Sequence, residues 1–594
     1  MSEKKVTFGR VFWPSLIAAF IVSVIGLLIW VIIIGSLVST EPTTMEVADK
    51  TVLHMTLDGS IGERGKSNFD PTSFQMTNTL GLSEILNGIE EAKNDDNIKG
   101  IFIEIGNLGC GFATAKEIHD ALNDFEESGK FVVAYNSGEV VSHLEYYISA
   151  AATENYGFPT TNVQFLGLGA ELMFFKNALD KLGVEMQVIR GSNNDFKSAV
   201  EPFFREDMSD SSRVQIERYI EGLWQDYRED IAIDRGLTAN KLNQLADNAD
   251  IKDVDDAVEH KLMDASMYRD EVIDIVREKA GTAESAELEL LAFSKFARKR
   301  FYQSQVLIEV DSPNIAVILA QGGISTNGDG MTSEEICKLF QEARANESIQ
   351  TVVFRVNSPG GSALASDEIW REVKLTNETK KVIVSMGDVA ASGGYYVATA
   401  ATAIFAEPNT ITGSIGVFGV IPYTGQMLED QLGLTFDRAS TNEHSIMTTN
   451  KRLTEEEFAM IQEVVDDIYF DFKSRVAEGR GMTVEQVDVI ARGRVWTGRD
   501  AQEIGLVDEL GGLTDAITYA ADLAGITDAK VLYYPIVKED IFGEFLEQLE
   551  EQTNVQSSPA LELPEALMKQ YAKLKMLESY SGIQMRLPYD LEIQ

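Results

Sequence analysis

Two patterns of hydrophobic residues alternate along most of the chain. Short β-branched runs, such as 352–356 and 382–384, are largely apolar, which is typical of parallel strands buried on both faces. Amphipathic stretches with helical spacing separate these runs. The alternation predicts β-α-β crossovers and therefore an α/β fold.

The same order of motifs occurs twice. The apolar run at 98–105 resembles the run at 349–356, and 130–133 resembles 381–384. Further matches keep this order: Tyr146-Tyr147 with Tyr395-Tyr396, Arg235-Gly236 with Arg480-Gly481, and Leu262-Met263-Asp264 with Leu506-Val507-Asp508. A preserved order makes chance a poor explanation. We therefore predict two similar α/β domains, at about 50–290 and 300–530, joined by the basic stretch 293–302. An acidic tail at 531–594, with a helix near 564–581, follows them.

The N-terminal region contains one long uncharged segment. Residues 11–40 carry no charge, which exceeds the roughly 20 residues needed to cross a bilayer. A cleaved signal peptide is the alternative, but its apolar region is only about 7–15 residues long and a small-residue cleavage site follows it. We predict an uncleaved transmembrane anchor at 11–38. Basic residues precede it and acidic residues follow it, so residues 1–10 are expected in the cytoplasm and both domains outside, in the periplasm of a bacterium with two membranes.

The charge and the cysteines narrow the possible partners. The 594 residues carry a net charge of −43, which disfavours nucleic acid as a partner and fits a solvated surface. Cys110 and Cys337 form no C-x-x-C pair and are expected to be packing residues. Metal-protease, phosphate-loop and complete calcium-loop motifs do not occur in the sequence, so neither a metal nor a cofactor is expected.

Only the second copy carries a serine flanked by small residues. Aligning the paired tyrosines places His143 of the first copy opposite Ser392 of the second. Gly393-Gly394 follows Ser392 and permits a tight turn from strand to helix. Backbone N–H groups at this turn, and at Gly360 in a neighbouring loop, could stabilise an oxyanion. Tight turns without a catalytic role are the alternative interpretation.

A nucleophilic serine needs a base, and the best candidate lies in the first copy. None of the five histidines has a triad context. Lys197, by contrast, lies among apolar neighbours, as expected for a lysine whose pKa burial lowers. The corresponding part of the second copy lacks such a lysine; Lys451 lies just beyond it, beside Arg452. Each copy has therefore lost what the other keeps, which predicts one site shared by both domains.

Several motifs together resemble the long form of the signal peptide peptidase A (protease IV) family. They are the stretches 196–203, 357–361, 391–396, 412–417 and 494–499. The resemblance runs from the anchor to about residue 530.

The resemblance implies two ClpP/crotonase-like domains and a Ser–Lys dyad protease. By position, Ser392 is expected to be the nucleophile, Lys197 the general base and Ser414 the residue that orients the lysine amine. Gly393 and Gly360 are expected to supply oxyanion N–H groups. The resemblance also implies a homotetramer, anchored in the bacterial inner membrane, that digests remnant signal peptides or other apolar peptides.

Two rival functions differ from this expectation. An acyl-CoA enzyme on the same fold would use the oxyanion site without a nucleophile. A catalytically inactive membrane scaffold that binds peptides would need neither Ser392 nor Lys197. The predicted membrane anchor and the complementary loss of the serine and the lysine argue against the acyl-CoA enzyme. The intact motifs around Ser392 and Lys197 argue against the scaffold. A protease with a wider range of substrates stays open, because fold and dyad do not fix a substrate.

Overall fold

The computed structural model describes residues 45–70, 75–283, 286–328, 330–536 and 582–586. The predicted anchor at 11–38 and the predicted helix near 564–581 lie outside these residues. Within the described part of the chain, no helix has the length and apolar character needed to cross a membrane.

The first domain is built on a parallel sheet of six strands. Their order is β10 (Ala265–Ser266), β7 (Glu154–Gly157), β5 (Phe131–Asn136), β4 (Ile98–Gly109), β1 (Thr51–Ser60) and β11 (Leu290–Ala292). Helices cover both faces of the sheet, as parallel sheets require. The apolar side chains of α2 (Leu82–Asn94) and α3 (Phe112–Glu127) pack on one face, and α10 (Arg269–Lys279) packs on the other.

The second domain repeats this sheet strand for strand. The order here is β22 (Glu509–Leu510), β18 (Ala403–Ala406), β17 (Lys381–Ala391), β15 (Thr351–Ser358), β12 (Ile315–Gln321) and β23 (Val531–Tyr534), again parallel throughout. Two further strands extend from the end of β17, β19 (Ile411–Gly413) and β21 (Val495–Thr497). The two similar α/β domains predicted from the repeat are confirmed at the level of strand order. β23 lies just beyond residue 530, where the second domain was predicted to end and the tail to begin.

Both faces of the second sheet are buried. Phe354 packs with α12 (Ser333–Ala345) and α13 (Ala363–Asn377), whereas its neighbour Val353 points to the other face, towards α11 (Phe293–Val310) and α19 (Leu513–Ala524). Successive residues of a strand point to opposite faces, which explains why the strand sequence is apolar at almost every position.

Hydrogen bonds between aligned residues also repeat in the two domains. The Tyr146 hydroxyl donates to the carbonyl of Leu262 at 2.7 Å, and the Tyr395 hydroxyl donates to that of Leu506 at 2.8 Å. These are pairs that the sequence repeat aligned. The two domains therefore use equivalent residues to tie the helix after the third strand of the sheet to the turn before an edge strand, β10 in the first domain and β22 in the second.

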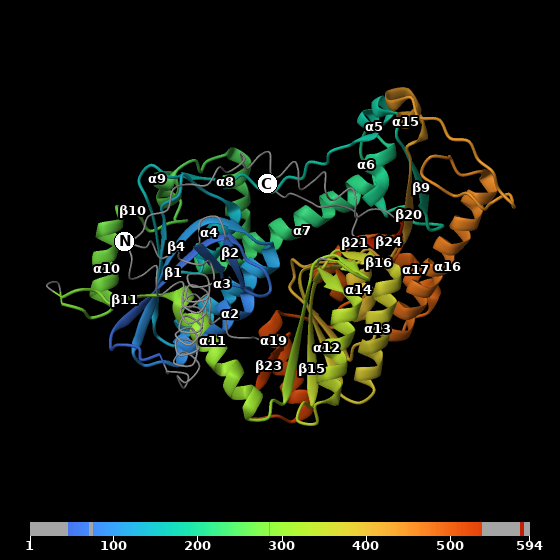
Figure 1. Cartoon of the computed structure of the whole chain (residues 1–594). Coiled ribbons are helices and arrows are strands. Elements are labelled where there is room, and N and C mark those ends of the chain that lie inside the picture. The colour runs from blue at the N-terminus through green and yellow to red at the C-terminus, as the bar shows by residue number, and fades with distance from the viewer. Residues whose placement is uncertain (1–44, 71–74, 284–285, 329, 537–581, 587–594) are drawn as a thin grey trace, which may run out of the picture.

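A third sheet lies on the second domain and includes a strand from the first copy. Its order is β14 (Met331–Thr332), β13 (Ile324–Ser325), β16 (Gly360–Ser362), β24 (Gly582–Arg586), β20 (Phe418–Tyr423) and β9 (Glu185–Arg190). In Figure 1 the segment with β9, α5 (Lys176–Leu182) and α6 (Glu201–Phe204) lies beside α15 (Gly425–Leu432) and α16 (Glu455–Arg480), and α7 (Asp210–Asp234) runs from it back towards the first domain. The first copy thus extends an arm over the second domain.

The remaining elements are short or peripheral. They comprise two small ladders, β2 (Lys66–Asp70) with β3 (Gln75–Thr79) and β6 (Val140–Val141) with β8 (Asn162–Val163), and the helices α4 (His143–Ala150), α8 (Ala239–Asn248), α9 (Val254–Glu259), α14 (Gly393–Ala398), α17 (Val484–Ile490) and α18 (Gly498–Glu503).

Candidate active site

Ser392 lies at the junction of a strand and a helix. β17 ends at Ala391 and α14 begins at Gly393, so Ser392 is the N-cap residue, with φ 56° and ψ −114°. A positive φ is strained for any residue with a Cβ atom. Two backbone hydrogen bonds hold this conformation: the Ser392 N–H donates to Gly413 at 2.8 Å, and the Ser392 carbonyl accepts from the Tyr396 N–H at 2.8 Å.

Lys197 is carried by the arm of the first copy, between β9 and α6. The arm is held by a small apolar cluster in which Val200 and Phe203 pack against Phe418 and Val420 of β20. The ladder between β9 and β20 runs over six residue pairs, from Phe418 with Arg190 to Tyr423 with Glu185. The lysine therefore belongs to the first copy in sequence but is positioned by the second domain.

The structure brings Lys197, Ser392 and Ser414 together. Lys197 Nζ lies 2.8 Å from Ser392 Oγ and 2.9 Å from Ser414 Oγ, and it donates to the Ser414 carbonyl at 2.9 Å. All three residues are fully buried. Burial lowers the pKa of Lys197 well below its ordinary value, because a charged ammonium loses its hydration there. The atoms within hydrogen-bonding distance of Nζ are uncharged oxygens, which compensate little of that loss.

The backbone around Ser414 is strained like that of Ser392. Ser414 has φ 50°, and its N–H donates to the carbonyl of Arg494 at 2.7 Å. This bond ties the residue to the loop before β21, so both its hydroxyl and its carbonyl face the lysine amine. The arrangement fixes where the amine can lie.

The two predicted oxyanion glycines are neighbours in space. A Cβ atom added to Gly360 would lie 2.7 Å from Gly393 N and 2.1 Å from the carbonyl oxygen of Met585. Gly360 has φ 94°, and its N–H donates to Ser358 Oγ at 3.2 Å. The N–H of Gly393 opens α14, where helices have no internal acceptor for it. A peptide carbonyl of β24 thus lies beside both glycines.

Sequence reasoning missed two residues that hold the lysine segment. A Cβ atom on Gly493 would lie 2.5 Å from Lys197 Cβ, so only a glycine allows this approach. Gln215 of α7 donates to the carbonyl of Phe196 at 3.0 Å and accepts from the Val495 N–H at 3.2 Å. The only sequence signal for Gly493 was its position directly before the matched stretch 494–499, and nothing in the sequence singled out Gln215.

In the first domain, the position that corresponds to Ser392 holds a histidine packed among aromatic rings. His143, opposite Ser392 in the repeat, is 7% exposed and lies among the rings of Phe165, Trp224 and Tyr227. Burial lowers the pKa of His143 to about 4. The rings fill this place as a packed core.

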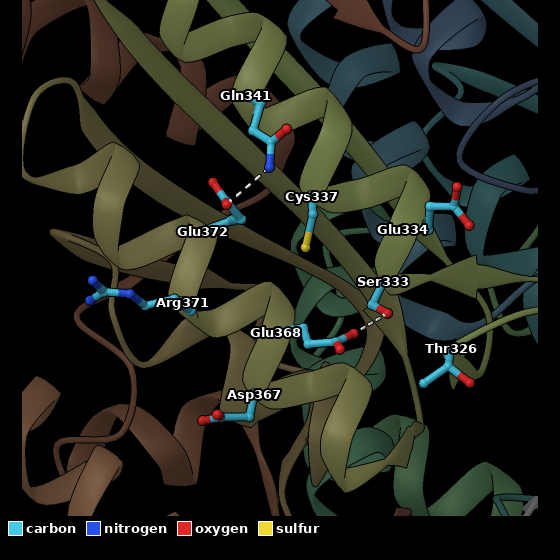
Figure 2. Close-up of a pocket in the computed structure, with 9 residues that line it drawn as sticks. All are labelled: Thr326, Ser333, Glu334, Cys337, Gln341, Asp367, Glu368, Arg371 and Glu372. Carbon is cyan, nitrogen blue, oxygen red and sulfur yellow. Dashed lines mark hydrogen bonds between the residues drawn. The ribbon is translucent and has the colours of Figure 1, made fainter.

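A separate pocket of about 650 Å³ lies between α12 and α13 (Figure 2). Four of its nine lining residues are acidic. Hydrogen bonds within the pocket join Ser333 to Glu368 and Gln341 to Glu372. None of the predicted site residues lines it. Burial raises the pKa of Cys337 in this pocket to about 11, so its thiol stays protonated and is a poor nucleophile. Across the residues that the structure describes, no group of three or more His, Cys, Asp or Glu side chains could hold a metal ion.

Comparison with known proteins identifies the family. The sequence model of peptidase family S49 matches the chain twice, at residues 124–283 and 374–527. The chain belongs to peptidase family S49. As an S49 member it is a serine peptidase, which favours neither the acyl-CoA enzyme nor the inactive scaffold. The model of Clp protease matches residues 318–412, in agreement with the ClpP-like sheet of the second domain.

Relatives of the S49 chain extend over most of its length. Protease 4 of Salmonella typhi is 34% identical over 80% of this chain and 77% of its own. The chloroplastic serine protease SPPA of Arabidopsis thaliana is 32% identical over 80% of this chain and 69% of its own. Protease 4 of Haemophilus influenzae is 29% identical over 84% and 83% of the two chains. These relatives confirm the resemblance to signal peptide peptidase A (protease IV).

Proposed function

We propose that this serine peptidase cleaves remnant signal peptides and similar apolar peptides through a dyad of Ser392 and Lys197. The observation that carries the proposal is the 2.8 Å distance between Lys197 Nζ and Ser392 Oγ in a fully buried setting. A lysine with a lowered pKa can be neutral at moderate pH and can therefore accept a proton.

The proposed reaction uses the chain's own residues and water. Neutral Lys197 takes the proton of Ser392 as its oxygen attacks the peptide carbonyl. The N–H groups of Gly393 and Gly360 stabilise the oxyanion, and Ser414 holds the lysine amine towards Ser392. The lysine then gives its proton to the leaving amine, and water hydrolyses the acyl-enzyme.

Membrane anchoring is part of the same proposal. The uncharged segment 11–40 and the basic residues before it support an inner-membrane anchor with both domains on the periplasmic side. The homotetramer rests on the family resemblance. Extraction of membranes at alkaline pH checks the anchor: the full chain is expected in the pellet, and a chain lacking 1–44 in the supernatant. A full chain in the supernatant would contradict the anchor.

Hydrolysis of a quenched, apolar, signal-peptide-like substrate tests the dyad. Ser392→Ala and Lys197→Ala are each expected to lose nearly all activity while keeping the wild-type circular dichroism spectrum. Lys451→Ala is the matched control, because Lys451 is partly exposed and forms an ion pair with Glu457 at 2.8 Å. Activity that survives in either dyad variant would contradict the assignment, and so would an equal loss in Lys451→Ala.

A further inference from the structure

Two strands of the second domain lose their register just before they reach the candidate site. β15 leads towards an oxyanion glycine, and β17 leads to the candidate nucleophile. Their residues pair evenly up to Val356 with Met386, and the pairing resumes at Ser358 with Ala390. One residue of β15, Asn357, therefore lies opposite three residues of β17. A bulge of this kind leaves backbone groups unpaired and bends the strand, so the ladder alone does not fix the two strand ends relative to each other.

The side chain of Asn357 bridges the bulge. Its Oδ1 accepts from the Val389 N–H of β17 at 3.2 Å. The Asn357 carbonyl accepts from the Gly322 N–H at 2.9 Å, so the residue is also tied to the turn after β12. A Cβ atom on Gly387 would lie 2.9 Å from Asn357 Cγ. The glycine therefore leaves the space that the amide fills.

Glu63 of the first domain fixes the orientation of the Asn357 amide. Asn357 Nδ2 donates to Glu63 Oε1 at 2.7 Å, and Glu63 Oε2 accepts from Arg355 Nε at 2.8 Å. The Glu63 backbone is held in turn, because its N–H donates to Gln321 Oε1 at 3.0 Å. A carboxylate only accepts hydrogen bonds, so the amide nitrogen must face Glu63 and the amide oxygen must face Val389. The donor and the acceptor of the amide are thus both used, in one orientation only.

The bridge lies three residues from each half of the candidate site. Gly360 follows Asn357 by three positions. Ser392 follows Val389 by the same number. The amide therefore holds together two short backbone segments, of which one carries an oxyanion donor and the other the attacking hydroxyl. A misplacement of about 1 Å at a catalytic group costs about 10²-fold in rate, so a change in the bridge should act on the chemical step.

We propose that Asn357 is a positioning residue for the peptidase reaction and that Glu63 orients it. The inference rests on the dyad and the oxyanion glycines of the proposed function. Asn357 fixes how far the Ser392 hydroxyl lies from the Gly360 N–H, and Glu63 keeps the amide in the orientation that bridges the bulge. The first domain therefore contributes to the site twice, through Lys197 and through Glu63.

Steady-state hydrolysis of the quenched peptide by Asn357→Ala tests the proposal. We expect kcat to fall ~10²-fold at a nearly unchanged KM, because the peptide is still bound while the reacting groups are misplaced. Asn377→Ala is the matched control. Asn377 also accepts from an N–H of β17, that of Val382 at 3.0 Å, but at the opposite end of the strand, and it donates to the Ala400 carbonyl at 2.9 Å. Asn377→Ala is expected to lower the urea midpoint and to keep kcat and KM.

Three outcomes would contradict the proposal. A wild-type chain without activity would overturn the proposed function and the positioning role together. An active wild type with an equal kcat in Asn357→Ala, or equal losses of kcat in the two alanine variants, would overturn the positioning role and leave the dyad standing. A higher KM at unchanged kcat in Asn357→Ala would also overturn it, because the residue would then act on peptide binding.

An exchange of donor and acceptor between the two side chains tests the role of Glu63. At alkaline pH, Asn357→Asp sets two carboxylates against each other and is expected to lose at least ~tenfold in kcat. Adding Glu63→Gln restores a donor to that contact and still leaves an oxygen for Arg355 Nε. The double variant is therefore expected to recover at least ~tenfold in kcat over Asn357→Asp, each variant being shown to be folded by circular dichroism. A folded double variant without this recovery would overturn the role of Glu63.

Discussion

The burial of Lys197 determines how the site should respond to pH. The ammonium form loses hydration in this setting, which lowers the pKa of Lys197. Only the unprotonated amine can accept the proton of Ser392, so the fraction of competent chains rises with pH and levels off above the lowered pKa.

We therefore expect kcat/KM for the quenched peptide to increase with pH through the Lys197 pKa and then to stay level. A pH profile of kcat/KM reports groups of the free enzyme and is the measurement that checks this. Lys451→Ala should show the same ascending limb as the wild type. A profile that is flat or descends over that interval would be incompatible with a lysine base.

Gly493 has two features that can be separated by mutation. Its φ of 78° is left-handed, and a Cβ atom there would meet Lys197 at 2.5 Å. Gly481 shares the left-handed φ, at 63°, but a Cβ atom there would have nothing within 4 Å.

Gly493→Ala is expected to lower kcat about 10²-fold, because a displacement of about 1 Å at a catalytic group has an effect of that size. Gly481→Ala is expected to keep full activity and to lower stability by ~1–2 kcal/mol, the usual cost of a left-handed alanine. Steady-state kinetics and urea unfolding of both variants check the pair. Equal activities would mean that crowding against Lys197 is unimportant.

At the scale of elements, the sequence predicted the repeated parts well and the third sheet poorly. The β-branched runs and the paired motifs were enough to predict the central strands of both parallel sheets. Strands β1, β4, β5 and β7 are neighbours in the first sheet in the order in which they follow one another along the chain, and β12, β15, β17 and β18 do the same in the second. The pattern of β9 or β24 indicates at most a short strand. Their partners lie far along the chain, as in the pairing of Arg190 with Phe418, and local propensity carries no information about such pairs. Lys197 could be found because its apolar neighbours are unusual, whereas the role of Gly493 depends on a neighbour that only the fold supplies.

The start of α3 depends on a residue of the other domain. Its N-cap residue is Gly111, which has no side chain to accept hydrogen bonds. Asp388 of β17 takes that place, with its carboxylate accepting from the Thr114 N–H at 2.8 Å and from the Thr114 hydroxyl at 2.8 Å. An acceptor at a helix N-terminus typically contributes ~0.5–2 kcal/mol.

Asp388→Ala is accordingly expected to reduce the free energy of unfolding by ~1–2 kcal/mol. Asp388→Asn keeps one acceptor oxygen and should lose less. Chemical denaturation followed by tryptophan fluorescence provides the comparison. If the alanine variant were as stable as the wild type, the contact between the domains would not be what holds the start of α3.

For the whole molecule, one buried cation joins the two domains. Arg355 of β15 is fully buried and forms ion pairs with Glu63 at 2.8 Å and Glu117 at 2.5 Å, both from the first domain. The two carboxylates raise the pKa of Arg355 above its ordinary value. Removing the guanidinium leaves two buried carboxylates without its positive charge beside them, which is more costly than never having built the cluster.

Arg355→Met is thus expected to destabilise the protein by ~3–5 kcal/mol. The exposed pair of Lys530 with Asp311, at 2.7 Å, is the matched comparison, and Lys530→Ala should change stability far less, because solvent screens an exposed pair. The midpoints and slopes of the urea unfolding curves of the two variants give the changes in the free energy of unfolding that are compared. A shift for Arg355→Met no larger than that for Lys530→Ala would show that the cluster contributes little to holding the domains together.

β24 lies between β16 and β20, and this limits the backbone conformation of any peptide that could take its place. With that strand gone, the facing edges would be about two strand spacings apart, roughly 9–10 Å. A helix with its side chains is ~10–12 Å wide and has already used its backbone hydrogen bonds. A peptide that is helical in a bilayer must therefore unwind before it can take the place of β24 and pair with both edges. Resistance to cleavage should then grow with the helical propensity of the residues that flank the bond, largely independent of which apolar side chain precedes it.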